Sequence, residues 1–270
     1  MVKLSKERYF KNKLRRITMQ PLIAIISPAK TFTDEEVISS ISLPIFQRKA
    51  DQLIQHLATY SPKELAQLYR SNESIALTNY QRFQDWDAVQ MSPALLCYNG
   101  LQFKAMQADV MTESMWRYLT EHLRILSALY GVLRPFDAIK PYRLDFNCQL
   151  QLDSSSSLYD FWGEKVAQAL SLDGGTLLNL ASAEFSKLVL PYLDRSKVQV
   201  IDFDFYKYDV EKERYYQPAT LAKQARGAMV RFLAEKEVSD PTELKAFQEL
   251  GLSFDAERSS TTHYVYCTKS

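Results

Sequence analysis

The chain has 270 residues, of which 46% are hydrophobic and 24% are charged. This composition is that of a globular protein with one large core or two modest ones, and it excludes disordered, collagen-like and coiled-coil proteins. No apolar run approaches the roughly 20 residues that span a bilayer, and the start of the chain lacks the apolar segment of a secretory signal. We therefore expect a cytoplasmic protein without a membrane partner.

Positive charge is concentrated at the start of the chain. Residues 1–20 hold seven basic side chains and one acidic side chain, a balance of +6, whereas the whole chain carries +1. The other 250 residues therefore carry +1 minus 6, or −5. We expect residues 1–20 to be a basic extension, either disordered or preceding a natural start at Met19, and residues 21–270 to form a single domain. A polyanion would then meet a local basic cluster or this extension rather than a uniformly basic surface.

Helices dominate the predicted first half of the chain. The apolar run LIAII at residues 22–26 predicts a buried strand that enters a loop at Ser27-Pro28. Helices are predicted after this strand, from Pro44 to about Thr59, from Pro62 behind its cap Ser61, at residues 73–84, and at residues 112–130 with Gly131 as a C-cap.

Strands and helices alternate in the predicted second half. Strands are predicted at residues 144–152, 176–180, 198–208 and 263–267, and helices at residues 158–172, 182–193 and 218–237 and after Asp240-Pro241. This alternation predicts a mixed α/β fold in which helices surround a central sheet.

Polar side chains follow two of the predicted strands. Ser27, Lys30 and Thr31 come after the first strand, and Asn179 and Ser182 come at the end of the strand at 176–180. If the two strands are parallel neighbours, both turns open on the same edge of the sheet, where hydroxyls, an amide and an ammonium group would bind an anion. Taken singly, a surface lysine and a serine N-cap are the simpler explanations.

A segment rich in cations and aromatic rings spans residues 122–146. It carries Arg124, Arg134 and Arg143, with Tyr142 among the interleaved aromatic residues. Arginines and rings on a proline-stiffened loop suit phosphate contacts and base stacking. A loop whose rings pack in the core and whose arginines pair with acids explains the pattern equally well.

The helix predicted at 218–237 contains a glycine between two cations. Lys223, Gly227 and Arg231 are spaced by four and fall together opposite the apolar stripe, with Arg226 at the margin. A glycine inside a helix costs about 1 kcal/mol relative to alanine, so it usually has a purpose. The pattern predicts a notch that admits an anion, or alternatively a close contact with a neighbouring element.

Residues 62–84 predict two short helices joined by a polar turn that contains Arg70, Asn72 and Ser74. Such a pair is either a helix-hairpin-helix module that contacts the DNA backbone or a plain αα-hairpin. No metal or cofactor is expected, because the three histidines are isolated and no C-x-x-C pair is present. Asp202 and Asp204 share a strand face, which we expect to be a solvated carboxylate face rather than a magnesium site.

Five segments, taken in order, resemble the YaaA family of bacterial peroxide-stress proteins. They are ISPAKTF, HLRILSALYGVLRPFDAIKPYRLDF, LYDFWG, NLASAEFSKLV, and KQARGAMVRFL followed by LSFD, and they span roughly residues 21–255. The resemblance implies a family-specific α/β fold with a basic cleft and a helix-hairpin-helix element. It also implies DNA binding and protection against hydrogen peroxide, associated with lower free iron. The chain departs from the family at YNGLQFKAM, where Leu101 replaces an acid of many relatives, and the extension before Met19 has no family counterpart.

Two hypotheses follow. The first is a DNA-binding stress protein with little sequence preference, whose cleft is lined by Lys30, Arg124, Arg134, Arg143, Lys187, Lys223 and Arg226. The second is an enzyme that acts on a nucleobase, nucleotide or related phosphate-bearing substrate at the strand ends. The sequence does not identify its proton-transfer residue, for which Tyr130, Tyr142 and Asp145 are the candidates. A role in iron handling or protein interaction ranks third, and the sequence indicates no oligomeric state.

Overall fold

The computed structural model describes residues 20–33, 42–152 and 155–268. The predicted basic extension therefore lies outside the described residues, except for Gln20. Among the helices of the described residues, none is both long and apolar enough to cross a membrane.

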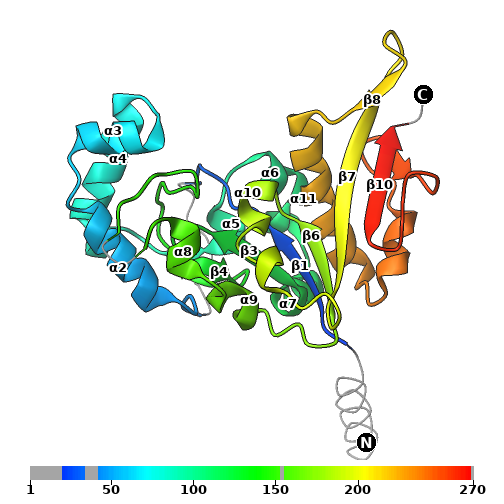
Figure 1. Cartoon of the computed structure of the whole chain (residues 1–270), viewed down its shortest axis with the longest axis horizontal. Helices are drawn as coiled ribbons and strands as arrows, with labels where there is room; N and C mark the ends of the chain where they lie inside the picture. Colours follow the sequence, from blue (N-terminus) through cyan, green and yellow to red (C-terminus); the bar gives the residue numbers. More distant parts are fainter. Residues whose placement is uncertain (1–19, 34–41, 153–154, 269–270) are drawn as a thin grey trace, which may run out of the picture.

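The described residues form a mixed α/β fold around an eight-stranded sheet (Figure 1). Its strands run in the order β4-β3-β1-β6-β7-β10-β9, and β8 pairs with β7. Their bounds are β1 Leu22–Ile26, β3 Leu123–Ser127, β4 Gly131–Leu133, β6 Thr176–Leu180, β7 Gln199–Asp209, β8 Arg214–Tyr216, β9 Leu252–Phe254 and β10 His263–Thr268. The five central strands, β3, β1, β6, β7 and β10, are parallel, and the others are antiparallel to their neighbours. Every residue of β1 and β6 is buried, as expected for apolar runs in the middle of a parallel sheet.

Helices surround this sheet, and a separate two-stranded sheet pairs β2 (Ser92–Pro93) with β5 (Ala138–Ile139). The α-helices are α2 Gln47–Leu57, α3 Pro62–Tyr69, α4 Glu73–Gln84, α5 Ala94–Cys97, α6 Leu101–Met106, α7 Glu113–His122, α8 Leu158–Trp162, α9 Lys165–Ala169, α10 Ala183–Ser186 and α11 Ala219–Lys236. The short 3₁₀-helices are η1 Trp86–Ala88, η2 Ala108–Val110, η3 Leu190–Tyr192 and η4 Pro241–Ala246. Helix α11 packs against α6 and β7, whereas α3 and α4 lie at the opposite end of the molecule from β10 (Figure 1).

The helix predicted at residues 112–130 is wrong in its second half. Helix α7 ends at His122, and β3 begins at the next residue. Leu123, Ile125 and Leu126 are completely buried, because β3 lies between β1 and β4 in the sheet. Sheet pairing at the centre of the molecule therefore overrides the helical tendency of the preceding residues.

The predicted strand at residues 144–152 is also wrong. Leu144, Phe146, Cys148 and Leu150 are buried alternately with more exposed residues, so the period of two is real, but this segment has no strand. The helix predicted at 158–172 is divided into α8 and α9 at Gly163, which has a φ of 51°. The predictions at residues 22–26, 73–84, 176–180 and 218–237 are confirmed to within a residue or two.

Candidate functional site

The ends of β1 and β6 meet at one edge of the sheet. The two strands are parallel neighbours, with Ile26 opposite Leu180. The Ser27 hydroxyl oxygen consequently accepts a hydrogen bond from the Ser182 backbone N–H at 2.9 Å and lies 3.2 Å from the Ser182 hydroxyl. The side-chain amide of Gln102, which is buried, donates to the Ser27 carbonyl at 3.1 Å. Two turns separated by 155 residues in sequence thus form one polar surface.

Two of the residues expected at this edge, Asn179 and Thr31, form hydrogen bonds within the protein. Asn179 donates to Asp202 at 2.6 Å and accepts from the Ala181 backbone N–H at 3.3 Å, so its amide fixes the sheet. The Thr31 hydroxyl donates to the Asn99 carbonyl, while the Asn99 N–H donates to the Thr31 carbonyl at 2.8 Å. These bonds hold the loop after β1 in place and leave Ser27 and Ser182 as the hydroxyls at the edge.

Two cations and one carboxylate meet beside this edge. Lys30 forms an ion pair with Asp145 at 2.9 Å, and the Arg143 Nε lies 3.6 Å from the same carboxylate oxygen. The Lys30 side chain is 57% exposed, whereas those of Arg143 and Asp145 are mostly buried. The three groups carry a net charge of +1, and the ammonium of Lys30 faces solvent. We call Lys30, Arg143 and Asp145 the basic cluster.

Tyr69, the last residue of α3, lies near the basic cluster. Its ring is buried, and burial raises the pKa of its hydroxyl, with the neighbouring Cys148 and Asp145 adding to the rise and Arg143 opposing it. The hydroxyl has no hydrogen-bond partner among the described residues. The sequence pattern does not indicate this proximity, because Tyr69 occupies an ordinary core position of an amphipathic helix.

The structure contradicts the prediction for Tyr142. It is predicted to stack on a base, but only 4% of its surface is exposed. Its hydroxyl hydrogen-bonds to the Ser127 hydroxyl at 2.7 Å and to the Tyr98 hydroxyl at 2.9 Å, and its ring packs against Phe32 and Tyr130. Burial raises the pKa of Tyr142. The ring is part of the core, so it cannot reach a base without unfolding.

The structure also contradicts the prediction that Arg124 contacts phosphate. Its guanidinium donates to the carbonyls of Thr120 at 3.1 Å and Leu123 at 2.7 Å, at the end of α7. Burial lowers its pKa, and the nearby Arg134 contributes to the lowering. This arginine satisfies carbonyls at a helix terminus, which is a structural role. Arg134 itself is exposed.

The prediction for helix α11 is the third that the structure contradicts, because the face predicted to be open packs on α6. A Cβ added at Gly227 would lie 1.9 Å from the Gln102 carbonyl oxygen and 3.1 Å from the Met106 nitrogen. Gly227 is therefore a packing notch, the alternative left open above. Arg231 pairs with Glu235 at 2.6 Å and donates to Gln107, so it is not free for a phosphate.

The other predicted cations of α10 and α11 differ in exposure. Lys223 and Lys187 are exposed. Arg226 is mostly withdrawn from solvent, and its Nε has no hydrogen-bond partner among the described residues. Burial lowers the pKa of Arg226, and the charge of Asp204 opposes this.

Comparison with known proteins identifies the family. The family described as "Peroxide stress protein YaaA" matches residues 22–258. The chain belongs to this family. A UPF0246 protein of Desulfitobacterium hafniense is 37% identical over 244 residues, which cover 90% of this chain and 96% of that protein. UPF0246 proteins of Pediococcus pentosaceus and Lactobacillus johnsonii are 37% and 39% identical over 245 and 246 residues, again 90% of this chain and 96% of each relative.

The resemblance drawn from the five segments is thus confirmed, and the YaaA family agrees with a role in oxidative stress. The α3–α4 pair of this YaaA-family chain is an αα-hairpin. Ser61 and Glu64 form a capping box at the start of α3, Arg70 ends α3 with a φ of 48°, and Asn72 caps α4. A role of this hairpin in DNA binding remains a prediction.

The three thiols and the two aspartates of β7 lie at defined places in this YaaA-family chain. Cys97, Cys148 and Cys267 are buried free thiols, and burial raises their pKa values to about 12, 11 and 11 respectively. Asp204 pairs with His263 at 2.9 Å, while Asp202 accepts from Asn179. No group of three or more metal-ligating side chains converges within residues 20–33, 42–152 and 155–268.

Proposed function

We propose that this YaaA-family protein binds duplex DNA during hydrogen peroxide stress, through phosphate contacts made by the basic cluster and the turn of the α3–α4 hairpin. The observation that carries the proposal is the convergence of Lys30 and Arg143, from segments more than a hundred residues apart, on one carboxylate oxygen of Asp145. Cations held at fixed positions on a rigid surface suit the phosphate backbone, which dominates the affinity of non-specific DNA binding.

The hairpin turn supplies further groups of the right chemistry. Arg70 and Asn72 are exposed at the turn, and Ser74 is exposed in the first turn of α4. The backbone N–H groups at the start of a helix favour anions, and α4 has twelve residues. Tyr69, at the end of α3, is close enough to Arg143 and Asp145 for their charges to act on its hydroxyl, which supports a shared binding surface for the turn and the basic cluster.

The expected mode of binding is backbone recognition without base readout. The burial of Tyr142 removes the ring predicted to stack on a base, and the groups named here reach phosphates rather than base edges. We expect the affinity to depend on DNA shape more than on sequence. With about two or three phosphates neutralised by Lys30, Arg143 and Arg70, log K should fall against log salt with a slope near −2 to −3.

The deciding experiment compares two lysines of the same kind in different places. Lys30 and Lys197 are both exposed and both pair with an aspartate, at 2.9 Å and 3.5 Å, but Lys197 lies near the start of β7, away from the basic cluster. Fluorescence anisotropy with a short duplex over a range of salt should give a slope smaller by about 0.9 for Lys30→Ala and an unchanged slope for Lys197→Ala. Equal behaviour of the two variants, or no binding at low salt, would contradict the proposal.

A second candidate is binding or turnover of a small phosphate-bearing substrate at the strand ends. The meeting of Ser27 and Ser182 favours it, since ligands of parallel sheets collect where the strands finish. Calorimetric titration with mononucleotides should then show saturable binding that Ser27→Ala abolishes. Lys30→Ala would separate the two candidates, because it should change the salt slope for DNA without abolishing nucleotide binding.

A further inference from the structure

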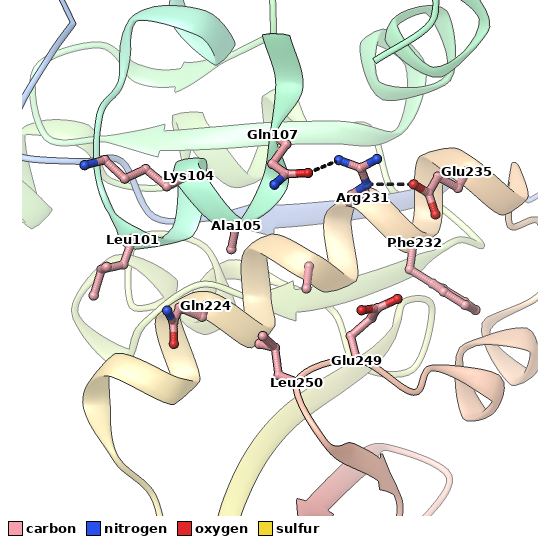
Figure 2. Close-up of a pocket in the computed structure, with 11 residues that line it drawn as sticks. Leu101, Lys104, Ala105, Gln107, Gln224, Arg231, Phe232, Glu235, Glu249 and Leu250 are labelled. Carbon is pink, nitrogen blue, oxygen red and sulfur yellow. Dashed lines mark hydrogen bonds and ion pairs between the residues drawn. The ribbon is translucent and has the colours of Figure 1, made fainter. Parts of the chain in front are cut away.

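A groove of about 600 Å³ lies between α6 and α11 and the turn before β9 (Figure 2). Its apolar lining includes Leu101, Ala105, Ala228, Phe232 and Leu250. Leu101 is 39% exposed and Leu250 is 46% exposed, so both leucines present apolar surface to water. The basic cluster and the strand-end serines do not line this groove.

The charges of the groove are separated along its length. Arg231, in the middle, forms an ion pair with Glu235 and donates a hydrogen bond to Gln107, and Figure 2 shows both contacts as dashed lines. Lys104 lies at one end of the groove and Glu249 toward the other (Figure 2). Neither Lys104 nor Glu249 has an ion-pair partner among the described residues. The groove thus has a basic end at Lys104 and an acidic end at Glu249, with the paired Arg231 between them and apolar side chains along its lining.

The backbone holds Leu250 in an unusual conformation. Its φ is 58°, and the next residue, Gly251, has a φ of 74°. A branched side chain rarely adopts this left-handed conformation, and strained residues of this kind concentrate at functional sites. This turn keeps the Leu250 side chain at the surface of the groove, where nearly half of it is in contact with water.

We propose that the groove is the contact surface between two copies of this chain, related by a two-fold axis. In a two-fold contact, residue i of one copy meets residue j of the other, and j meets i. A surface with a basic end and an acidic end is its own complement under this operation, because Lys104 of each copy faces Glu249 of the other. Leu101 and Leu250 of each copy enter the groove of the other, which removes their apolar surface from water.

The first test is the mass of the full-length chain in solution, measured by sedimentation over a wide range of concentration. The native chain should show a concentration-dependent dimer. Leu250→Arg should be a monomer, because it replaces exposed apolar surface of the contact with a charge. Val210→Arg is the matched control, since Val210 is 72% exposed in the turn between β7 and β8, and this variant should remain a dimer.

The second test uses the two-fold relation itself. In Lys104→Glu both ends of the groove are acidic, and in Glu249→Lys both ends are basic. Each reversal affects two symmetric contacts, so each variant alone should have a dissociation constant at least about tenfold higher than the native chain. An equimolar mixture of the two variants should recover dimers that contain one copy of each.

Circular dichroism shows whether each variant is folded, and the mixing result holds even if Leu250→Arg is not. A native chain that stays monomeric at the highest concentration measured would overturn the proposal. So would a dimer in Leu250→Arg that is as stable as the native dimer, or a mixture that forms no mixed dimers. The outcome is independent of DNA binding, because the test requires no nucleic acid.

Discussion

Gly227 is the residue whose substitution separates helix propensity from packing. Gly227→Ala improves the helical propensity of α11 by about 1 kcal/mol. The added Cβ would nevertheless lie 1.9 Å from the Gln102 carbonyl oxygen, so α6 and α11 must move apart. We expect a net loss of about 2 kcal/mol or more in the free energy of unfolding, measured with urea. Lys223→Ala on the same helix is exposed and should change stability by less than about 0.5 kcal/mol.

A variant that is more stable than the native chain would show that α6 yields to the new methyl group. Either result decides whether the close packing of α6 and α11 requires a glycine at position 227. A close backbone approach, rather than a notch for phosphate, is what the geometry provides.

Asp137 gives the stability of the fold a defined pH dependence. Its carboxylate is completely buried, where it accepts from the Ser42 hydroxyl at 2.5 Å and the Arg134 backbone N–H at 2.8 Å. Burial raises its pKa above the usual value, although these hydrogen bonds and the charges of Arg134 and Arg124 oppose the rise. The folded protein therefore holds this proton more tightly than the unfolded chain does. The stabilising contribution of the proton is complete below the ordinary pKa and is lost as pH rises through the folded pKa.

The comparison of native protein with Asp137→Asn measures this contribution. Asparagine has no charge to lose, so the stability of the native protein relative to the variant should fall as pH rises through the mildly acidic range. Unfolding free energies at a series of pH values give the difference directly. A difference that rises with pH would mean that the hydrogen bonds and neighbouring arginines outweigh burial.

At the scale of elements, the first turn of α3 depends on a single cap. The Ser61 hydroxyl accepts from the Glu64 N–H at 3.3 Å, and the Ser61 N–H donates to the Glu64 carboxylate at 2.8 Å. Hydrogen bonding to Ser61 lowers the pKa of Glu64. Ser61→Ala should cost about 1 kcal/mol, concentrated in α3 because this helix has only eight residues. In Ser61→Ala, hydrogen exchange of the α3 amides should be faster than in the native chain, and the exchange of β1 should change less. Equal acceleration of α3 and β1 would contradict a local effect.

Elements were predictable where one local pattern agreed with the final environment. Residues 22–26 and 176–180 are short apolar runs, and both became central strands. Residues 73–84 follow an asparagine that caps the helix, and α4 has these bounds. Residues 123–127 could not be assigned in this way, because LRILS is compatible with the end of a helix until β1 and β4 are known to flank it. The alternation at 144–152 reflects packing against the core without strand pairing.

The candidate site was predictable only in part for the same reason. The meeting of Ser27 with Ser182 follows from parallel strands, which the alternation of strands and helices indicated. The burial of Tyr142 depends on a neighbour from another segment, Tyr98. The bonds of Arg124 are local, but the carbonyls of Thr120 and Leu123 are available to it only because α7 ends at His122, a boundary that the sequence pattern does not predict. The sequence shows which contacts a side chain can make. Its neighbours in the folded chain determine whether its polar groups are still available to a ligand.

At the scale of the whole molecule, the core shields all three thiols. Cys97, Cys148 and Cys267 are each at most 6% exposed, and raised pKa values keep them protonated near neutral pH. In the native protein, a thiol reagent should react only as fast as the chain opens, and all three thiols should react rapidly in denaturant. Hydrogen peroxide should likewise leave the thiols reduced, as mass spectrometry can measure. Rapid labelling of one thiol in native protein would identify it as a redox-active site.

The connection between Ser27 and Ser182 also sets the order in which the chain can fold. Strand β1 is made early in synthesis, but its partners β3 and β6 begin at residues 123 and 176. During synthesis, both edges of β1 therefore stay unpaired until β3 and β6 have left the ribosome. Contacts between segments so distant in sequence also form slowly. A chain truncated before residue 176 leaves one edge of β1 without its partner and should aggregate through it. Ser27 and Ser182 can therefore bind a ligand together only after β1 has paired with β6.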